Sequence, residues 1–319
     1  MRYTLTASLI AFISTGAFYY SSSRPKALEL VQISNTWIEN VAIRSNGDLL
    51  MTTIGEGKVY TFSPTAKTAA SNPIFKIEGV NALSGIAEVG QDVFAVTGGT
   101  FEGMYQNNTM NLSLLKFDGD SFSISTVFQK SKYGPVNGIS ALPRHKHIIL
   151  AADAERGEIL RIDTTTGHVE AAMKDKALAP VPGGPFPVGV NGIKIFNDYL
   201  YFTNTAHQSF NRVKIDDMGN QLGDFEVLAK LEKGSPYAPD DFAMDRHGNA
   251  YVVYWQDRIV KITQGGEQTI LLDGLLAGPS SATFSNDGKT LYVVTSGQNN
   301  LAVSGGQVVE VKLSRFEYS

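Results

Sequence analysis

One short phrase recurs along this chain, and it constrains the fold more than any other feature. In each copy a polar pair opens an apolar, strand-like run, a turn follows, and a second apolar run comes next. The pairs are Glu39-Asn40, Ser84-Gly85, Asn137-Gly138, Asn191-Gly192, Asp240-Asp241 and Ser280-Ser281. They lie 45, 53, 54, 49 and 40 residues apart, with no helical pattern between them. This period is typical of a radial propeller, so the sequence predicts an all-β, six-bladed β-propeller.

The repeat also predicts where function lies. The innermost strand of each blade begins with a polar pair, and these strand starts meet around one mouth of the central channel. No linker interrupts the units, which favours a single propeller domain over residues 23–319. The strand-like residues 27–33 are expected to complete the last blade and leave no bare edge. A second interpretation of each polar pair is that it only satisfies backbone groups in a narrow channel.

Composition fits a well-packed globular protein and excludes some partners. The hydrophobic content is 43%, the charged content is 18% and the net charge is −4. No stripe of Lys and Arg interleaved with aromatic residues is present, so no nucleic-acid partner is expected. The chain has no cysteine, and a propeller with a large core does not need disulfides.

Residues 1–22 are predicted to be a signal peptide. Arg2 supplies a basic start, and the apolar run that follows is about fourteen residues long, shorter than the roughly 20 that span a bilayer. A signal anchor or a plain tail is the alternative. Cleavage would leave no membrane span and place the protein in the secretory pathway or outside the cell. Glycosylation triplets at Asn107 and Asn111 agree with passage through a secretory lumen.

Two long interruptions break the repeat. Residues 98–111 widen the second unit, and residues 173–189, rich in Pro and Gly, separate the third unit from the fourth. Long loops inside a compact repeat commonly carry binding specificity. We expect both to wall the mouth of the channel, and the alternative is that they are plain surface insertions.

With these phrases the chain resembles the SMP-30/gluconolactonase/strictosidine-synthase-like propellers. The resemblance rests on Glu39, Asn137-Gly138, Asn191-Gly192 and Pro239-Asp240 at the starts of four units. In lactonase members such residues hold a divalent cation, so the resemblance implies Ca²⁺ or Zn²⁺ on Glu39, Asn191 and Asp240, with Asn137 beside them. The chain departs from the family where Glu-Gly-Pro is replaced by Glu39-Asn40-Val41 and Asn-Asp-Gly by Val136-Asn137-Gly138.

A narrower resemblance is to a set of secreted-type fungal propellers. It rests on residues 36–47, which include Trp37 and Asn40, and on residues 239–245. That set includes hetero-Diels–Alderases, which join a quinone methide to the alkene of a terpene. The resemblance implies an enzyme of secondary-metabolite biosynthesis that takes hydrophobic or polyphenolic small molecules. It implies no required cofactor, with Ca²⁺ or Zn²⁺ as the alternative.

A cycloaddition of this kind needs groups that hold two reactants and polarise a carbonyl, and it needs no nucleophile. The candidate catalytic residues are Asn40, Asn137, Asn191, Asp240, His207 and Ser281. The candidate substrate contacts are Trp37, Phe186, Tyr254, Trp255 and Ser280. His207 would serve as acid or base in dehydrating a precursor, and the alternative is a solvated loop histidine.

Three classes of function stay open at this point. The cyclase is favoured because residues 36–47 resemble the biosynthetic set and because the lactonase phrases are altered at two units. A metal-dependent lactone hydrolase would use Asp240 or Asp241 as base beside the cation. A non-catalytic propeller that binds a small molecule is the third class, since the fold hosts both roles.

Overall fold

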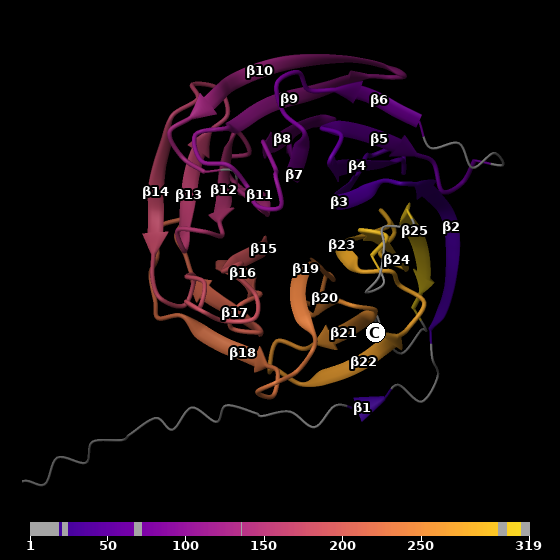
Figure 1. Ribbon diagram of the computed structural model, residues 1–319, viewed down its shortest axis with the longest axis vertical. Helices are drawn as coiled ribbons and strands as arrows, with labels where there is room; N and C mark the ends of the chain where they lie inside the picture. Colours follow the sequence, from indigo (N-terminus) through magenta and orange to yellow (C-terminus); the bar gives the residue numbers. More distant parts are fainter. Residues whose placement is uncertain (1–18, 21–24, 67–71, 135, 299–304, 314–319) are drawn as a thin grey trace, which may run out of the picture.

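The strands of this chain form sheets arranged around a central axis (Figure 1). The computed structural model describes residues 19–20, 25–66, 72–134, 136–298 and 305–313. Over these ranges the regular elements are all β-strands. None of the described segments is a helix long and apolar enough to span a membrane. The predicted all-β propeller is therefore confirmed.

Each repeat unit places its strands in order from the axis to the rim. The inner strands are β3 (Trp37–Ile43), β7 (Ala82–Gly90), β11 (Ile139–Ala141), β15 (Val190–Phe196), β19 (Ala238–Met244) and β23 (Pro279–Phe284). The second strands are β4 (Leu49–Ile54), β8 (Val93–Gly99), β12 (Ile148–Asp153), β16 (Tyr199–Asn204), β20 (Ala250–Trp255) and β24 (Thr290–Thr295).

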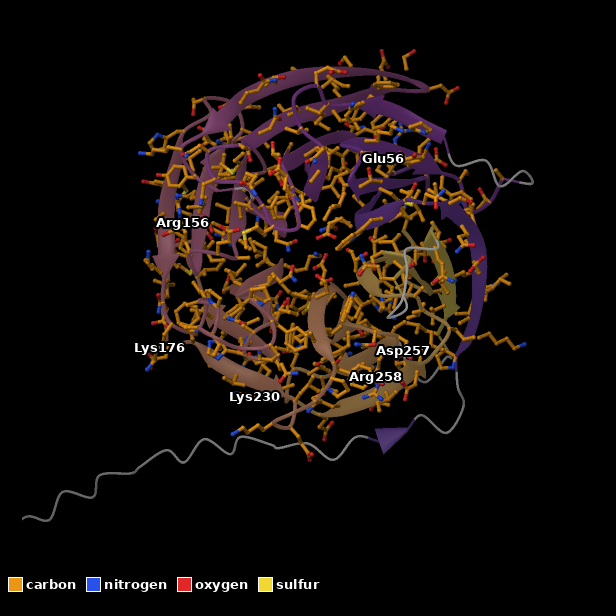
Figure 2. All side chains as sticks on the ribbon, viewed as in Figure 1. Glu56, Arg156, Lys176, Lys230, Asp257 and Arg258 are labelled. Atoms are coloured by element: carbon orange, nitrogen blue, oxygen red, sulfur yellow. The ribbon has the colours of Figure 1, made fainter. Side chains whose placement is uncertain are left out.

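Two further sets of strands lie farther out. The third strands are β5 (Lys58–Phe62), β9 (Met110–Asp118), β13 (Glu158–Asp163), β17 (Ser209–Lys214), β21 (Arg258–Ile262) and β25 (Gly305–Lys312). The rim strands are β6 (Asn72–Lys76), β10 (Ser121–Ser131), β14 (Val169–Lys174), β18 (Glu226–Lys230), β22 (Gln268–Asp273) and β2 (Lys26–Ser34). β1 (Tyr19–Tyr20) adds to β22 in parallel. Exposed side chains such as Lys176 and Lys230 point away from the rim (Figure 2).

Hydrogen bonding divides the described strands into five sheets. Four of them match single repeat units, one with β1 as an addition. The eight-stranded sheet contains two units, β3 to β6 and β7 to β10, which are joined by the one pairing of Ile54 with Ala82. Six sheets result only if this large sheet is divided at the Ile54–Ala82 pairing. The number of blades, six, therefore stays a prediction.

An N-terminal strand closes the ring, as residues 27–33 predicted. β2 pairs antiparallel with β25 from Lys26–Lys312 to Ser34–Gly305, so the edge of the last sheet is covered. The core cluster at this seam joins Ile38 and Met51 of the first unit to Tyr292 and Val308 of the last. β25 is mostly buried, and the half-buried Leu30, Val31 and Ile33 of β2 pack against this cluster, so closure contributes apolar packing as well as backbone hydrogen bonds.

The recurring polar pairs coincide with irregularities in the inner strands. The pairing register shifts between Ile38 and Asn40 in β3, and between Pro239 and Phe242 in β19. β7, β15 and β23 carry the same kind of shift at their own pairs. A β-bulge places two residues opposite one and redirects a side chain. The bulges thus turn adjacent polar residues toward different parts of the channel.

Hydrogen bonds between neighbouring repeat units form a ring around the axis, with donors on inner and second strands. Thr52 and Ser84 donate to the carbonyls of Ser84 and Val136, respectively. Gly138 N donates to the Asn191 carbonyl at 3.1 Å. The ring continues from Thr203 to the Asp240 carbonyl, from Ser281 to Asp241, and from Ser280 to the Ile38 carbonyl. The second interpretation of the polar pairs is therefore correct for Ser84 and Ser280.

Candidate functional site

A pocket of about 490 Å³ lies at the end of the channel where the inner strands begin. Seven predicted site residues line it: Glu39, Asn137, Asn191, Asp240, Trp37, Phe186 and Trp255. Both long interruptions also contribute, through residues 101–107 and 186–188. The prediction that these insertions wall the mouth is confirmed. Residues from four inner-strand regions and from both long interruptions thus meet at one hollow.

One wall of the pocket is a small hairpin inside the first interruption. Its backbone closes with Gln106 N on the Thr100 carbonyl at 2.8 Å. The Asn81 side chain holds it from the neighbouring turn, since it both accepts from Phe101 N and donates to the Phe101 carbonyl. Phe101 stands edge-on to Tyr105 at 5.2 Å and to Trp37 at 6.0 Å between ring centroids. The result is an aromatic wall with fixed ring orientations.

The opposite wall comes from the second interruption and is also anchored. Val188 accepts a hydrogen bond from Ala206 N at 2.7 Å. The Asn204 side chain donates to the Ala177 and Ala179 carbonyls. A side chain at Gly189 would come within 2.5 Å of the Leu178 carbonyl, so the loop can follow this path only with glycine there. These contacts present Phe186 and Val188 to the pocket.

Two acidic residues, Glu39 and Asp240, form the floor. Trp37 Nε1 donates to Glu39 Oε2 at 2.9 Å, and the Glu39 side chain is buried. Burial raises the pKa of Glu39 to about 7, against the lowering effect of the Trp37 hydrogen bond, and the Asp241 charge raises it further. Burial and then the charge of Glu39 hold the pKa of Asp240 well above its usual range. With a pKa of about 7, Glu39 is in part protonated at neutral pH.

A buried ion pair supports the floor from below. Asp241, the second member of the bulged pair, receives Lys194 Nζ at 2.7 Å and Ser281 Oγ at 2.8 Å. Ser281 Oγ also lies 3.0 Å from Asn40 Oδ1. A Cβ at Gly192 would meet Asp241 Oδ1 at 2.3 Å, so only glycine permits this approach. Asp240 thus faces the pocket, while Asp241 is fully engaged beneath it.

Five predicted site residues lie outside the pocket lining. They are Asn40, Ser280, Ser281, Tyr254 and His207. Asn40 and Ser281 are buried in the network under the floor, and Ser280 Oγ donates to the Ile38 carbonyl at 2.7 Å in the ring between inner strands. Their hydroxyl and amide groups form hydrogen bonds within the protein. Tyr254 is 2% exposed in the core cluster that also holds Phe242, because its strand position faces the neighbouring sheet. Tyr254 is therefore no pocket wall.

His207 is also absent from the pocket lining. It lies in the turn between β16 and β17, where its backbone N donates to Asn204 Oδ1 at 2.9 Å. Thr205 of the same turn lines the pocket, but His207 does not, so the predicted acid or base role has no geometric support. The ionisable acids that line the pocket are carboxyls, those of Glu39, Glu155 and Asp240.

The two predicted glycosylation sites differ in the folded chain. Asn107 is exposed and stands at the edge of the pocket. Asn111 is 2% exposed within β9 and accepts a hydrogen bond from Ser113 Oγ at 3.1 Å. A glycan on Asn111 does not fit this packing, which corrects that half of the expectation. Most of the predicted signal peptide lies outside the described residues, and secretion stays a prediction.

The residues that the resemblance assigns to a metal have suitable chemistry for a hard cation. Asn191 Oδ1 is buried without a hydrogen-bond partner, while its Nδ2 donates to Thr205 Oγ1 at 3.0 Å. The carboxyls of Glu39 and Asp240 repel each other electrostatically, which a cation would relieve. Oxygen donors of this kind favour Ca²⁺ over Zn²⁺. Among the described residues, however, no three His, Cys, Asp or Glu side chains form a metal-binding cluster.

Tyr105 is a site residue that the sequence reasoning missed. It lines the pocket, and its hydroxyl is buried without a hydrogen-bond partner, although the Ser84 side chain is nearby. Burial raises the pKa of Tyr105 well above its ordinary value, and the Glu39 charge adds to the effect. Its only signal in the sequence was its place inside the first interruption. Phe101, in the same interruption, and Thr205, in the turn after β16, were missed as well.

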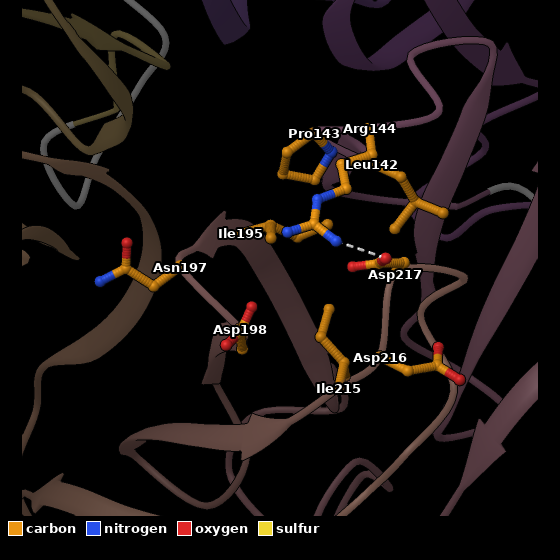
Figure 3. Close-up of a pocket in the computed structure, with 9 residues that line it drawn as sticks. All are labelled: Leu142, Pro143, Arg144, Ile195, Asn197, Asp198, Ile215, Asp216 and Asp217. Carbon is orange, nitrogen blue, oxygen red and sulfur yellow. Dashed lines mark hydrogen bonds and ion pairs between the residues drawn. The ribbon is translucent and has the colours of Figure 1, made fainter.

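A second hollow of about 580 Å³ lies elsewhere, among the turns around Pro143, Asn197 and Asp216 (Figure 3). Its polar groups serve the turns themselves. The Asp216 carboxylate accepts from Met218 N and Asn220 N, and Asp217 pairs with Arg144 at 2.6 Å. None of the recurring polar pairs reaches this hollow. The aromatic pocket is therefore the better candidate site.

Comparison with known proteins places the chain among similar propellers. Residues 188–297 match the family model described as "SMP-30/Gluconolactonase/LRE-like region". A Phoma sp protein named "Putative hetero-Diels-Alderase" is 27% identical, and the alignment covers 98% of this chain and 99% of that protein. A protein of the same description from Sarocladium schorii is 29% identical over 67% of this chain. The match spans 59% of that relative's length.

Solved structures support the fold. A luciferin-regenerating enzyme superposes with a TM-score of 0.67 at 18% identity, covering 91% of this chain and 96% of that structure. A calcium-binding regucalcin from Agrobacterium tumefaciens gives 0.67 at 14% identity, covering 93% and 97%. At these identities the likeness concerns architecture alone.

Proposed function

This chain carries an SMP-30/gluconolactonase/LRE-like region, and from that premise we propose that it is a biosynthetic cyclase. The proposed reaction is a hetero-Diels–Alder cycloaddition between a quinone-methide-type polyketide and an alkene of a terpene. The observation that carries the proposal is the pocket itself, in which Trp37, Phe101, Phe186 and Trp255 line the walls above two floor carboxyls, the buried Glu39 and the half-buried Asp240. Similarity to the Phoma sp protein over nearly the whole chain supports the same reaction class.

The aromatic walls would position the two reactants. In the reaction an O=C–C=C unit adds to a C=C bond, so that one C–O and one C–C bond form and no atom leaves. Holding the partners as a near-attack pair lowers the entropic part of the barrier, an effect that reaches roughly 7–11 kcal/mol in ideal cases. Phe101 and Trp37, fixed edge-to-face on one side, suit a planar quinone methide. Phe186 and Val188 on the other side suit an alkene.

The protonated carboxyl of Asp240 would supply the electrostatic contribution. As the bonds form, electron density from the alkene moves toward the quinone-methide oxygen. A donor aimed at that oxygen stabilises the transition state, and its effect is large where water is excluded. Burial and the charge of Glu39 raise the pKa of Asp240, which favours the protonated form that can donate. The same acid can protonate the leaving hydroxyl of a precursor that loses water to form the quinone methide.

A lactone hydrolase is the second candidate, and one observation favours it. The unpartnered Asn191 Oδ1 lies beside the two floor carboxyls, and together these groups would hold a divalent cation. The cation would polarise the lactone carbonyl when bound. Asp241 is not available as base, since Lys194 and Ser281 occupy its oxygens, which leaves Glu39 or Asp240 for that role.

The test compares product formation by the full chain, by Asp240→Leu and by boiled protein. The substrates are a quinone-methide precursor and a cyclic terpene alkene. The full chain should accelerate the cycloaddition with enantiomeric excess, and Asp240→Leu should lose about a hundredfold in rate. Arg144→Ala, far from the pocket, is the control and should keep full activity. Racemic product at equal rates in all tubes contradicts the cyclase, and Ca²⁺-dependent opening of an aldonolactone supports the hydrolase.

A further inference from the structure

Tyr105 lines the pocket, and its hydroxyl is buried near the Ser84 side chain without a hydrogen-bond partner. It lies on the hairpin wall, fixed by the Phe101 ring at 5.2 Å and by the Asn81 anchor of that hairpin. The oxygen is buried and has no hydrogen-bond partner. An unsatisfied buried hydroxyl is costly, and native proteins rarely keep one without reason. A ligand oxygen in the pocket would satisfy it.

The charge of the lining limits what that ligand can be. Glu39, Glu155 and Asp240 line the pocket, whereas Lys, Arg and His are all absent from its described lining. Lys194 is bound to Asp241 beneath the floor. A carboxylate or a phosphate would therefore meet acidic groups and no counter-charge. An uncharged ligand meets no such penalty.

We propose that Tyr105 is a further catalytic residue, whose hydroxyl donates to the carbonyl oxygen of an uncharged aromatic ketone or quinone methide. The proposal rests on the proposed function and deepens it. Both reactants enter as neutral molecules, so the alkene partner is a free hydrocarbon or alcohol and not a diphosphate. Tyr105 and Asp240 reach the pocket from different elements, the hairpin and β19. Their two donors would hold the oxygen while the aromatic wall holds the ring.

Binding can be measured apart from turnover. The chain has two tryptophans, and both line the pocket, so quenching of tryptophan fluorescence reports occupancy directly. Four matched probes are titrated: 2-acetylnaphthalene, 2-ethylnaphthalene, 2-naphthoate and 2-(aminomethyl)naphthalene. Calorimetry gives their affinities for the full chain, for Tyr105→Phe and for Tyr133→Phe. Tyr133 is the control, since its hydroxyl bonds to the Val169 carbonyl outside the pocket.

The ketone should bind the full chain more tightly than the ethyl probe, and 2-naphthoate should not bind. Tyr105→Phe should weaken ketone binding roughly three- to tenfold and leave the ethyl probe unchanged. Tyr133→Phe should change neither. Equal ketone affinity for the full chain and Tyr105→Phe overturns the proposal, as does tight binding of 2-naphthoate. Tightest binding of the amine would show a cation site instead.

The outcomes separate this inference from the cyclase. Tyr105-dependent ketone binding without any cycloaddition would leave the inference standing and the proposed reaction wrong. Cycloaddition that proceeds equally in the full chain and Tyr105→Phe would keep the reaction and reject the role of Tyr105. Both variants exchange one hydroxyl for hydrogen, so a melting temperature within a few degrees of the full chain confirms that the fold is kept.

Discussion

Glu39 shows most directly how burial changes the chemistry of one residue. Its side chain is 7% exposed, and its hydrogen bond from Trp37 offsets only part of the cost of removing the carboxyl from water. The group stays partly protonated near neutral pH, as a carboxyl in an apolar site does. The bulge of a different inner strand, β19, places Asp241 in an ion pair with Lys194 instead. Glu39 is therefore a buried carboxyl with a raised pKa, whereas Asp241 is an ion-paired carboxylate.

The raised pKa of Glu39 predicts how stability depends on pH. The unfolded carboxyl loses its proton near pH 4.5 and the folded one near pH 7. Between these values the folded state binds more protons, so stability falls as pH rises through this window. The Glu39→Gln variant has no carboxyl at this position, so its stability does not fall in this pH window. It should be more stable than the full chain by about 3 kcal/mol at pH 8 and equal to it at pH 4.

Urea unfolding in the presence of a chelator, at a series of pH values, measures this difference. Glu78→Gln, an exposed position, is the control and should stay within about 0.5 kcal/mol of the full chain at every pH. A Glu39→Gln curve parallel to that of the full chain would contradict the prediction. If added Ca²⁺ stabilises the full chain but not Glu39→Gln, the metal-binding alternative gains support.

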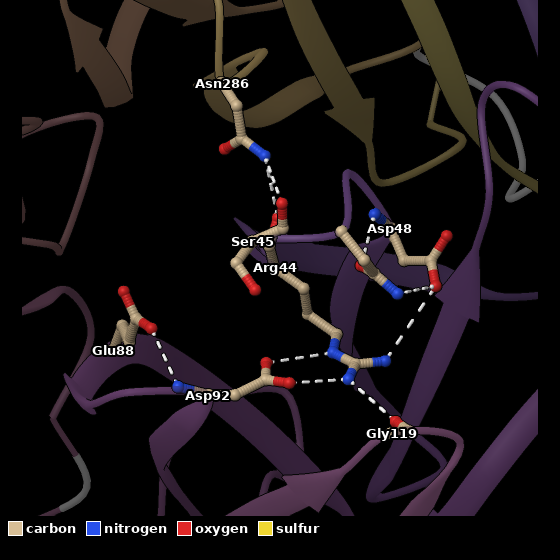
Figure 4. A network of polar contacts seen from close by, with 8 residues as sticks. Arg44, Ser45, Asp48, Glu88, Asp92, Gly119 and Asn286 are labelled. Carbon is tan, nitrogen blue, oxygen red and sulfur yellow. Dashed lines mark hydrogen bonds and ion pairs between the residues drawn. The ribbon is translucent and has the colours of Figure 1, made fainter.

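At the scale of elements, turns at the end of the channel away from the pocket tie neighbouring units together. Arg44, in the turn after β3, extends to Asp92 in the turn before β8 (Figure 4). Its guanidinium binds both oxygens of Asp92, at 3.0 and 2.6 Å, and donates to the Gly119 carbonyl at 3.1 Å. It also lies 3.7 Å from the centre of the Phe117 ring. A buried bidentate pair of this kind specifies how two units meet.

Arg44→Ala should cost about 3 kcal/mol of stability, because it leaves Asp92 without its partner and removes the stacked guanidinium. The matched control is Arg144→Ala. Arg144 forms a 2.6 Å pair with Asp217, but the two side chains are 72% and 51% exposed, so its loss should cost less than about 1 kcal/mol. Thermal and denaturant unfolding compare the two variants. Equal losses would mean that burial does not decide the strength of these pairs.

At the scale of the whole molecule, closure of the ring decides whether the fold holds together. β2 covers β25 along eight pairings, and Leu30, Val31 and Ile33 pack on the core cluster of the seam. A chain that begins at residue 35 lacks this strand and exposes the edge of β25. Bare edges pair with other chains. The shortened chain should lose its cooperative melt and aggregate as its concentration rises.

The control for this truncation is a chain that begins at residue 23, without the predicted signal peptide. It keeps β2 and should melt as the full chain does. Circular dichroism and light scattering follow both. Cooperative melting of the residue-35 chain at the same temperature would show that the ring is stable while open.

The sequence by itself determined the architecture and the place of the site. A polar pair repeated at intervals of 40 to 54 residues indicates a series of similar structural units. When such units are arranged around an axis, the polar residues that begin their inner strands meet at the same end of the channel. This placed Glu39, Asn137, Asn191 and Asp240 at one mouth, and the two interruptions beside it. Such periodic information is local, because each unit repeats the same strand pattern.

Only the tertiary structure decided which polar residue does what. Asp240 and Asp241 are equivalent in the sequence, and a bulge in β19 separates them into floor and support. The contact of Ser281 with Asn40 joins residues 241 positions apart. Tyr105 entered the site because an irregular hairpin folded over the channel. Burial, bulges and loop packing arise from contacts between distant segments. The spacing of residues along the chain does not predict these contacts.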